Sequence, residues 1–210
     1  MRTTTPISVA PLFICLASIV APAGEEGFVP LFNGKDLAGW KETGKQGSFT
    51  VKDGVIVGKK GKDTAYLLST EKKYGDFVLR LEYRLTTNGN SGVFIRVPHF
   101  EGRSSREGME IQLQDDKGKE DKHKPEQRTG AIYGAVPPTR AAARGPGEWN
   151  SLEILCQGDR IQVTLNGVVV NDAKMSEHEA LKKRPREGFI CLSAHTNVVE
   201  LKDLRLKELR

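Results

Sequence analysis

The chain has 210 residues, enough for one domain or at most two small ones, and 28% charged with 38% hydrophobic residues excludes a wholly disordered protein. The net charge is only +5, and the lysines and arginines are interspersed with acids, which argues against a nucleic-acid-binding surface. Gly is frequent, at 22 residues, and no repeat of 34 or 40 residues is visible, so turn-rich β structure is the leading class.

Residues 1–23 have the features of a secretory signal sequence. Arg2 is their only charge, Val9–Val20 is an apolar stretch, and Ala21-Pro22-Ala23 gives the small-x-small cleavage pattern. Twelve residues of helix span ~18 Å, short of the ~30 Å hydrocarbon core, so we do not expect a membrane span. We expect a secreted or periplasmic protein whose mature chain starts near Gly24, with a retained anchor as the alternative. Intact-mass measurement checks the cleavage.

The region 24–210 has the alternation of a β protein and is expected to form a single domain. In Phe77–Leu85, apolar residues occupy every second position, so one face of the strand is buried and the other is wet or functional. Similar runs are Gly92–Val97, Met109–Gln114, Trp149–Cys156, Ile161–Leu165, Gly188–His195 and Val198–Leu206.

Turn signals separate many of these strands. Asp53-Gly54 and Asn166-Gly167 predict tight hairpins, because Gly adopts positive φ without steric cost. A short helix is indicated only around Ser176–Lys183, and residues 98–108 and 115–128 are expected to be long loops at a rim. Ten or more short strands favour an all-β, two-sheet antiparallel jelly-roll sandwich.

Two cysteines remain after the leader, Cys156 and Cys191, both in expected strands. An oxidising compartment permits a bridge between them, and buried free thiols are equally consistent with the sequence. No Cys/His spacing resembles a zinc site, and Asp115 with Asp116 is the one weak indication of a divalent cation such as Ca²⁺.

Several phrases of the chain resemble the 3-keto-disaccharide hydrolase domain family, in the family's order and from about residue 28 to 209. They are LFNGKDL at 31–37 with Gly39-Trp40, GNSGVFIR at 89–96, MEIQLQD at 109–115, TGAIY at 129–133, GEWN at 147–150, LNG at 165–167, 188–195 and LRLKEL at 204–209. Thr196 stands where the family tends to have Gly. The resemblance implies a concanavalin A-like lectin/glucanase fold and an exported enzyme that acts on sugars.

Glu110, Gln112 and Gln114 alternate on one expected strand, so they share a face at ~6.6–6.8 Å intervals. Ordinary glycoside hydrolysis needs two carboxyl groups, and an amide can neither attack as a carboxylate nor shuttle a proton. Asp115 has the opposite parity unless the strand ends there. This strand therefore supplies one acid of the two.

A single base suits a 3-keto-glycoside, the substrate that the resemblance implies. The ketone at C3 acidifies the C2 proton and places the C1 leaving group β to it, so one base and one enolate stabiliser can expel the aglycone. We expect Glu110 or His195 to be the base, and Arg96 with Asn90 to stabilise the enolate.

The expected substrate-binding residues are Asn90, Gln112, Gln114 and Tyr133, with a carbohydrate as the only partner class indicated. The main alternative is a non-catalytic carbohydrate-binding module, because the same fold serves lectins. A third alternative is a structural or adhesive exported domain, which would show no saturable sugar binding.

Overall fold

The computed structural model describes residues 26–43, 47–59, 66–99, 107–117, 123–195 and 197–209. The expected leader and Thr196 lie outside these residues, as do most of the loop 98–108 and part of the loop 115–128. Export therefore stays a prediction. Within the described ranges, no helix is long and apolar enough to cross a membrane.

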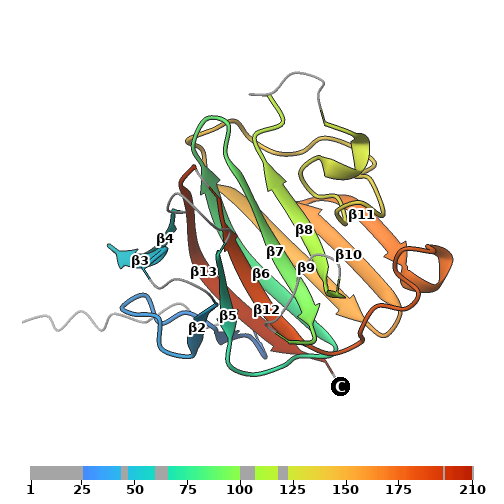
Figure 1. Ribbon diagram of the computed structural model, residues 1–210, viewed down its shortest axis with the longest axis horizontal. Helices are drawn as coiled ribbons and strands as arrows, with labels where there is room; N and C mark the ends of the chain where they lie inside the picture. Colours follow the sequence, from blue (N-terminus) through green and yellow to red (C-terminus); the bar gives the residue numbers. More distant parts are fainter. Residues whose placement is uncertain are drawn as a thin grey trace, which may run out of the picture.

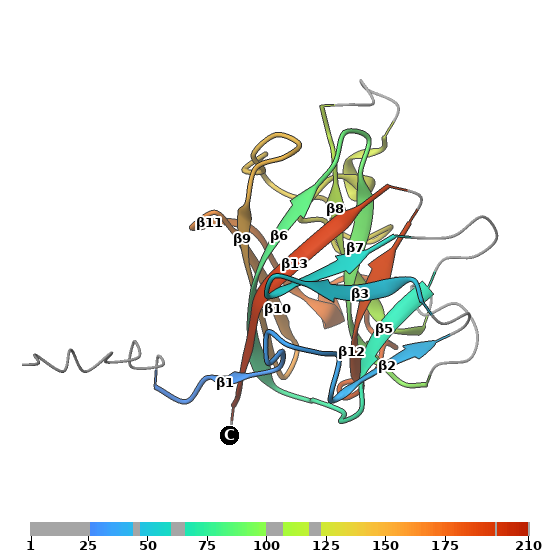
Figure 2. The same cartoon turned by 90° about the vertical axis from the view of Figure 1, so that its left-hand side faces the viewer.

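The described residues form two antiparallel sheets that pack face to face (Figure 1; Figure 2). The larger sheet has the order β11 (Val168–Lys174), β10 (Arg160–Leu165), β9 (Asn150–Gln157), β6 (Phe77–Leu85), β13 (Val199–Glu208), β4 (Val55–Gly58) and β3 (Phe49–Lys52), with β1 (Val29–Pro30) paired to β13. The smaller sheet has the order β2 (Trp40–Thr43), β5 (Tyr66–Thr70), β12 (Phe189–Ala194), β7 (Asn90–Val97) and β8 (Met109–Gln114). The predicted all-β two-sheet sandwich is confirmed.

Local sequence explains the hairpins. Asp53 and Gly54 have φ of 51° and 77° between β3 and β4, and Asn166 and Gly167 have φ of 50° and 79° between β10 and β11. Both positions of each turn are left-handed, the geometry that matches strand twist in a two-residue hairpin. The helix expected around Ser176–Lys183 is a single 3₁₀ turn, η2 (Met175–Glu177), followed by further turns; η1 (Pro125–Gln127) is another such turn.

The two sheets differ in how they bury their faces. In β6, buried and half-buried residues alternate, so its inner side chains pack in the core while Arg80 and Glu82 stand on the outer face. In contrast, β8 is buried at every position and β7 at all but its first. The outer face of the smaller sheet is therefore also withdrawn from water, although it carries polar side chains.

The two cysteines are free thiols in different sheets. Cys156 of β9 lies in the main core between the sheets. Cys191 of β12 belongs to a second, smaller apolar cluster with Phe94 and Val97. Of the two alternatives that the sequence leaves open, the structure has the free thiols.

Candidate functional site

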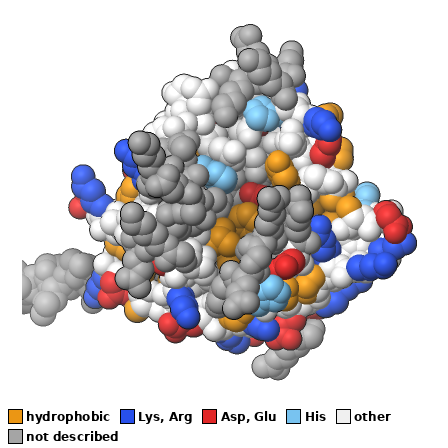
Figure 3. Space-filling view, in the orientation of Figure 1, with side chains coloured by type: hydrophobic (Ala, Val, Ile, Leu, Met, Phe, Trp, Pro, Cys, Tyr) orange, Lys and Arg blue, Asp and Glu red, His pale blue; other side chains and the backbone are white. Residues whose placement is uncertain are grey.

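The acid and the two amides of β8 share the outer face of the smaller sheet. The register between β7 and β8 places Glu110 opposite Phe94, Gln112 opposite Gly92, and Gln114 opposite Asn90. The alternate residues Ile111 and Leu113 belong to the main core, so Glu110, Gln112 and Gln114 point away from it. This is the face turned towards the viewer in Figure 1, and Figure 3 shows hydrophobic, acidic and histidine side chains gathered near its centre.

The amides form a short network on this face. The Gln112 Nε2 donates to Gln114 Oε1 at 3.1 Å and to Asn90 Oδ1 at 3.3 Å. Gln112 and Gln114 are only 2% and 5% exposed, yet Gln112 Oε1 and Gln114 Nε2 have no hydrogen-bond partner among the described residues. A buried amide atom without a partner costs free energy. One acceptor and one donor are therefore available to a ligand that brings hydroxyl or carbonyl groups.

Glu110 is the buried acid of this face. It is 7% exposed, and burial raises the pKa of its carboxyl from 4.5 to about 8. In the part of the chain that the structure describes, no cation pairs with it. Loss of hydration disfavours the carboxylate, so the group is protonated at neutral pH and becomes a stronger base once it has lost its proton. These are properties of a general acid or base.

Residues 129–133 line the free edge of β8. Gly130 donates its backbone N–H to the Gln112 carbonyl oxygen, and Tyr133 donates its own to the Glu110 carbonyl oxygen, both at 2.9 Å. A bridge between Ile111 and Ile132 sets Tyr133 beside Glu110. The Tyr133 ring is 39% exposed, and its hydroxyl accepts a hydrogen bond from Gln127 at 3.1 Å. Tyr133 thus stands at the rim of the same face, where a ligand can reach it.

His195 follows the last residue of β12 and is half-buried. Leu192 pairs with Val93, so the same register continued by three residues sets His195 opposite Asn90. This parity gives His195 the same face as Asn90 and Gln114. At ~3.3 Å per residue and ~4.8 Å per strand, its Cα lies about 16 Å from that of Glu110. The two side chains can flank a sugar ring, but they stand at opposite ends of the face.

Arg96 is not brought to this face, contrary to the expected alternation of β7. Its φ of 52° interrupts the strand, and the β7–β12 register shifts beside it. The guanidinium is fully buried and donates to the carbonyl oxygens of Gly75 and Gly158, both at 3.1 Å, and to Asp76 at 3.0 Å. A bulge of this kind redirects a side chain. Arg96 therefore ties β7 to the start of β6 and to the β9–β10 turn, away from Glu110.

Asp115 and Asp116 accept backbone hydrogen bonds from the β6–β7 turn and from the loop that follows β8. The strand ends at Gln114, and Asp115 accepts from the backbone N–H of Asn88 at 2.9 Å and of Lys117 at 3.2 Å. Asp116 accepts from the Thr129 N–H at 3.1 Å. Across the described ranges, no three His, Cys, Asp or Glu side chains gather as a metal site would require. Asp115 therefore does not supply the second acid next to Glu110.

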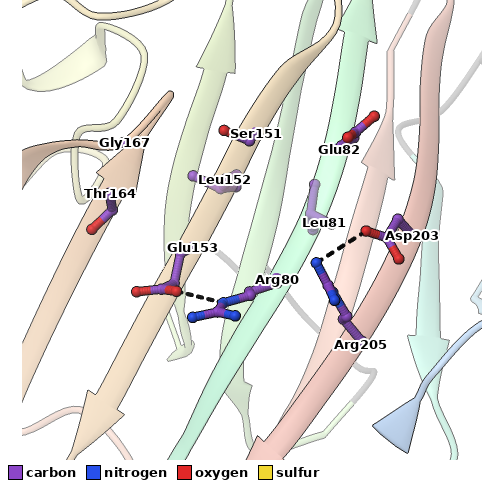
Figure 4. Close-up of a pocket in the computed structure, with 10 residues that line it drawn as sticks. All are labelled: Arg80, Leu81, Glu82, Ser151, Leu152, Glu153, Thr164, Gly167, Asp203 and Arg205. Atoms are coloured by element: carbon purple, nitrogen blue, oxygen red, sulfur yellow. Dashed lines mark hydrogen bonds and ion pairs between the residues drawn. The ribbon is translucent and has the colours of Figure 1, made fainter. Parts of the chain in front are cut away.

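A cavity of about 260 Å³ lies on the opposite face of the sandwich, over the larger sheet (Figure 4). The two arginines that line it form ion pairs with neighbouring acids: Arg80 Nε lies 2.6 Å from Glu153, and Arg205 Nη2 lies 3.3 Å from Asp203. Exposed pairs of this kind are typical of a solvated sheet surface. The face that carries Glu110 is therefore the better candidate site.

Gly92 is a site residue that sequence reasoning missed. A Cβ at this position would lie 2.8 Å from Glu110 Cγ and 2.9 Å from Glu110 Cδ, with Oε1 closer still. Space for the Glu110 side chain therefore depends on the missing side chain of Gly92. The signal was available, because a Gly inside a strand pattern often marks a close approach.

Comparison with known proteins shows the family and the fold of the chain. The sequence model of the 3-keto-alpha-glucoside-1,2-lyase-like domain matches residues 27–207. A 3-keto-disaccharide hydrolase from Bacteroides thetaiotaomicron is 24% identical over 160 residues, which cover 66% of this chain and 55% of that protein. The chain thus spans little more than half the length of this curated relative.

Solved structures show the same architecture. A proposed glycosyl hydrolase from Parabacteroides distasonis has 29% identity and a TM-score of 0.76, covering 88% of this chain and 95% of its own. A carbohydrate-binding module from Bacillus subtilis has 13% identity and a TM-score of 0.55, covering 81% and 96%. At that identity the second likeness concerns the fold alone.

Proposed function

Because the chain belongs to the family of 3-keto-alpha-glucoside-1,2-lyase-like domains, we propose that it cleaves the glycosidic bond of 3-keto-glycosides, including 3-keto-disaccharides. The observation that carries this proposal is the buried acid Glu110, set on one face of β8 in a row with the amides Gln112 and Gln114. Ordinary glycosidases need a second carboxyl, ~5–9.5 Å from the first. The outward-facing positions that follow Glu110 on β8 are the amides Gln112 and Gln114, and the strand ends before Asp115. A substrate whose cleavage needs one base fits such a site.

The reaction proceeds by elimination and then hydration. Glu110 takes the proton from C2, the electrons of that bond form the enolate with the C3 ketone, and the C1–O bond breaks as Glu110 passes this proton to the oxygen of the leaving aglycone. Water then adds to the resulting enone: Glu110 takes a proton from the attacking water, the hydroxyl bonds to C1, and Glu110 delivers the water-derived proton to C2. Each half of the reaction takes one proton onto Glu110 and releases one, so Glu110 returns to its starting state after one turnover.

The amides supply the donors that the enolate requires. Gln114 Nε2 is a buried donor without a partner in the described residues, and Asn90 Oδ1 is engaged by Gln112, which orients the Asn90 amide. Neutral donors fixed before the reaction stabilise developing negative charge without reorganisation. Arg96 does not stabilise the enolate in this proposal, because its guanidinium is hydrogen-bonded to Gly75, Asp76 and Gly158. His195 at the far end of the face and Tyr133 at the rim bind hydroxyl groups.

The experiment compares aglycone release from matched 3-keto and unoxidised glycosides. We expect release from the 3-keto substrate only, and loss of turnover with retained sugar binding in Glu110→Gln. Glu71→Gln, on an exposed surface, is the control that keeps full activity. Equal rates on the two substrates would contradict the elimination.

The pH dependence identifies the base. Glu110 must be ionised to act, and its pKa is about 8, so kcat/KM rises with pH through that value. A midpoint near that of an ordinary histidine, ~6.5, would instead support His195 as the base.

A carbohydrate-binding module is the second candidate, favoured by the unpartnered amide atoms of Gln112 and Gln114. It predicts saturable sugar binding without turnover of any 3-keto-glycoside by the unaltered protein. Absence of both turnover and saturable binding would instead favour a structural or adhesive role.

A further inference from the structure

Gly92 lies at the centre of the outer face, directly beneath the carboxyl group of Glu110. It faces Gln112 on β8, and the register of β12 continued by one residue sets Ser193 on its other side. Glu110 belongs to β8 and is opposite Phe94, yet its Cγ, Cδ and Oε1 all reach the space above Gly92. The Glu110 side chain therefore extends across β7. Its Cα is opposite Phe94, but its carboxyl group lies over Gly92, two residues away along β7.

We propose that Gly92 is a positioning residue for Glu110: its missing side chain allows the acid of an edge strand to hold its carboxyl over the middle of the sheet. This inference rests on the proposed function. Gly92 and His195 have Cα atoms about 8 Å apart by strand geometry, half the separation of Glu110 and His195. The bare backbone at residue 92 thus brings the base next to the row formed by Gln114, Asn90 and His195, where the sugar lies.

A methyl group at residue 92 cannot coexist with this placement. The contacts of 2.8 Å and 2.9 Å with Glu110 Cγ and Cδ are closer than ordinary Cβ contacts, so the Glu110 side chain must move. Gly92 has no positive φ, so alanine meets no backbone strain there. The substitution therefore acts on Glu110 rather than on the fold of β7.

The test is Gly92→Ala, with Gly75→Ala as the matched control. A Cβ at Gly75 meets only the Arg186 carbonyl oxygen at 3.6 Å, an ordinary contact. We expect Gly92→Ala to lower kcat on the 3-keto substrate about 100-fold, because a misplacement of ~1 Å is enough to cause a loss of that size. The acidic limb of its pH–rate profile moves to lower pH, because the displaced carboxyl gains contact with water. Gly75→Ala keeps the parent values.

Thermal unfolding separates a positioning role from a merely structural one. Gly92→Ala lowers Tm by several degrees in the parent protein and has little effect in the Glu110→Ala background, where the space above residue 92 is vacant. If Gly92→Ala alone does not fold, the double variant Gly92→Ala/Glu110→Ala still tests the inference. We expect it to fold, because truncation of Glu110 removes the clash with the new methyl group.

Two results would overturn the inference: a parent-like kcat and pH profile in Gly92→Ala, or an equal loss of Tm with and without the Glu110 side chain. Failure of the proposed function gives a different result, namely full turnover in Glu110→Gln with the stability coupling between residues 92 and 110 intact.

Discussion

The carboxyl group of Glu110 is buried from water, and none of the described residues places a cation beside it that would stabilise its ionised form. Burial is the cause of its raised pKa, and the amide neighbours on β8 bring dipoles but no charge. In the unfolded chain the carboxyl titrates near 4.5, whereas in the folded protein it titrates at about 8. Between these values the unfolded state is ionised and the folded state is not, so rising pH favours unfolding.

We predict that Glu110→Gln stabilises the protein at alkaline pH. Glutamine mimics the protonated acid and never ionises, so the variant and parent have similar Tm values near pH 4.5, and the gap grows until pH passes 8. A shift from 4.5 to about 8 corresponds to at most roughly 5 kcal/mol at ~1.4 kcal/mol per pKa unit. Calorimetry from pH 4.5 to 9 measures the gap, and a Tm difference that does not change with pH would contradict the assignment.

At the scale of the element, the strand pattern predicts faces well wherever the strand is regular. Alternation in Met109–Gln114 was enough to place Glu110, Gln112 and Gln114 together, and Asp53-Gly54 and Asn166-Gly167 were enough to place two turns. The position of Asn90 opposite Gln114 depends instead on the pairing of β7 with β8. The local sequence of either strand does not indicate which strand it pairs with.

Arg96 shows why the rest could not be predicted. Its expected face followed from strict alternation with Phe94, but one residue with φ of 52° breaks the parity of β7. A single bulge redirects the following side chains, and arginine is not a residue whose presence marks left-handed backbone. The burial of Glu110 was equally hidden, because alternation separates the two faces of a strand but does not tell how far the outer face is exposed to water.

We predict that Arg96→Ala affects stability rather than chemistry. Its removal leaves the Gly75 and Gly158 carbonyl oxygens without this donor and takes away the ion pair with Asp76, at a cost of about 2–4 kcal/mol. Urea unfolding should show a lower midpoint, whereas kcat per folded molecule stays within a few-fold of the parent. A large loss of kcat in fully folded protein would restore Arg96 to the catalytic set.

At the scale of the whole molecule, the sandwich separates its two cysteines. Cys156 lies in the core between the sheets, whereas Cys191 belongs to the apolar cluster with Phe94 outside that core. Burial raises the pKa of both thiols to about 12, so neither is a ready nucleophile.

We predict that the folded protein has no bridge between Cys156 and Cys191 even when it is purified without reductant. Iodoacetamide should label neither thiol in the native protein and both in denaturant, as read by peptide mass spectrometry. Dithiothreitol should leave Tm unchanged. A peptide that joins the two cysteines, or a Tm that falls with dithiothreitol, would contradict this arrangement.

The most direct measurement of the elimination follows the C2 hydrogen of a 3-keto-glycoside in D₂O. Proton removal at C2 followed by hydration predicts a product that carries one deuterium at C2 from its first appearance, formed by the parent protein and not by Glu110→Gln. The free 3-keto sugar, incubated alone for the same time, measures background exchange. A product that keeps its original C2 hydrogen would mean that the C1–O bond breaks without an enolate, and the account of Glu110 as the C2 base would be wrong.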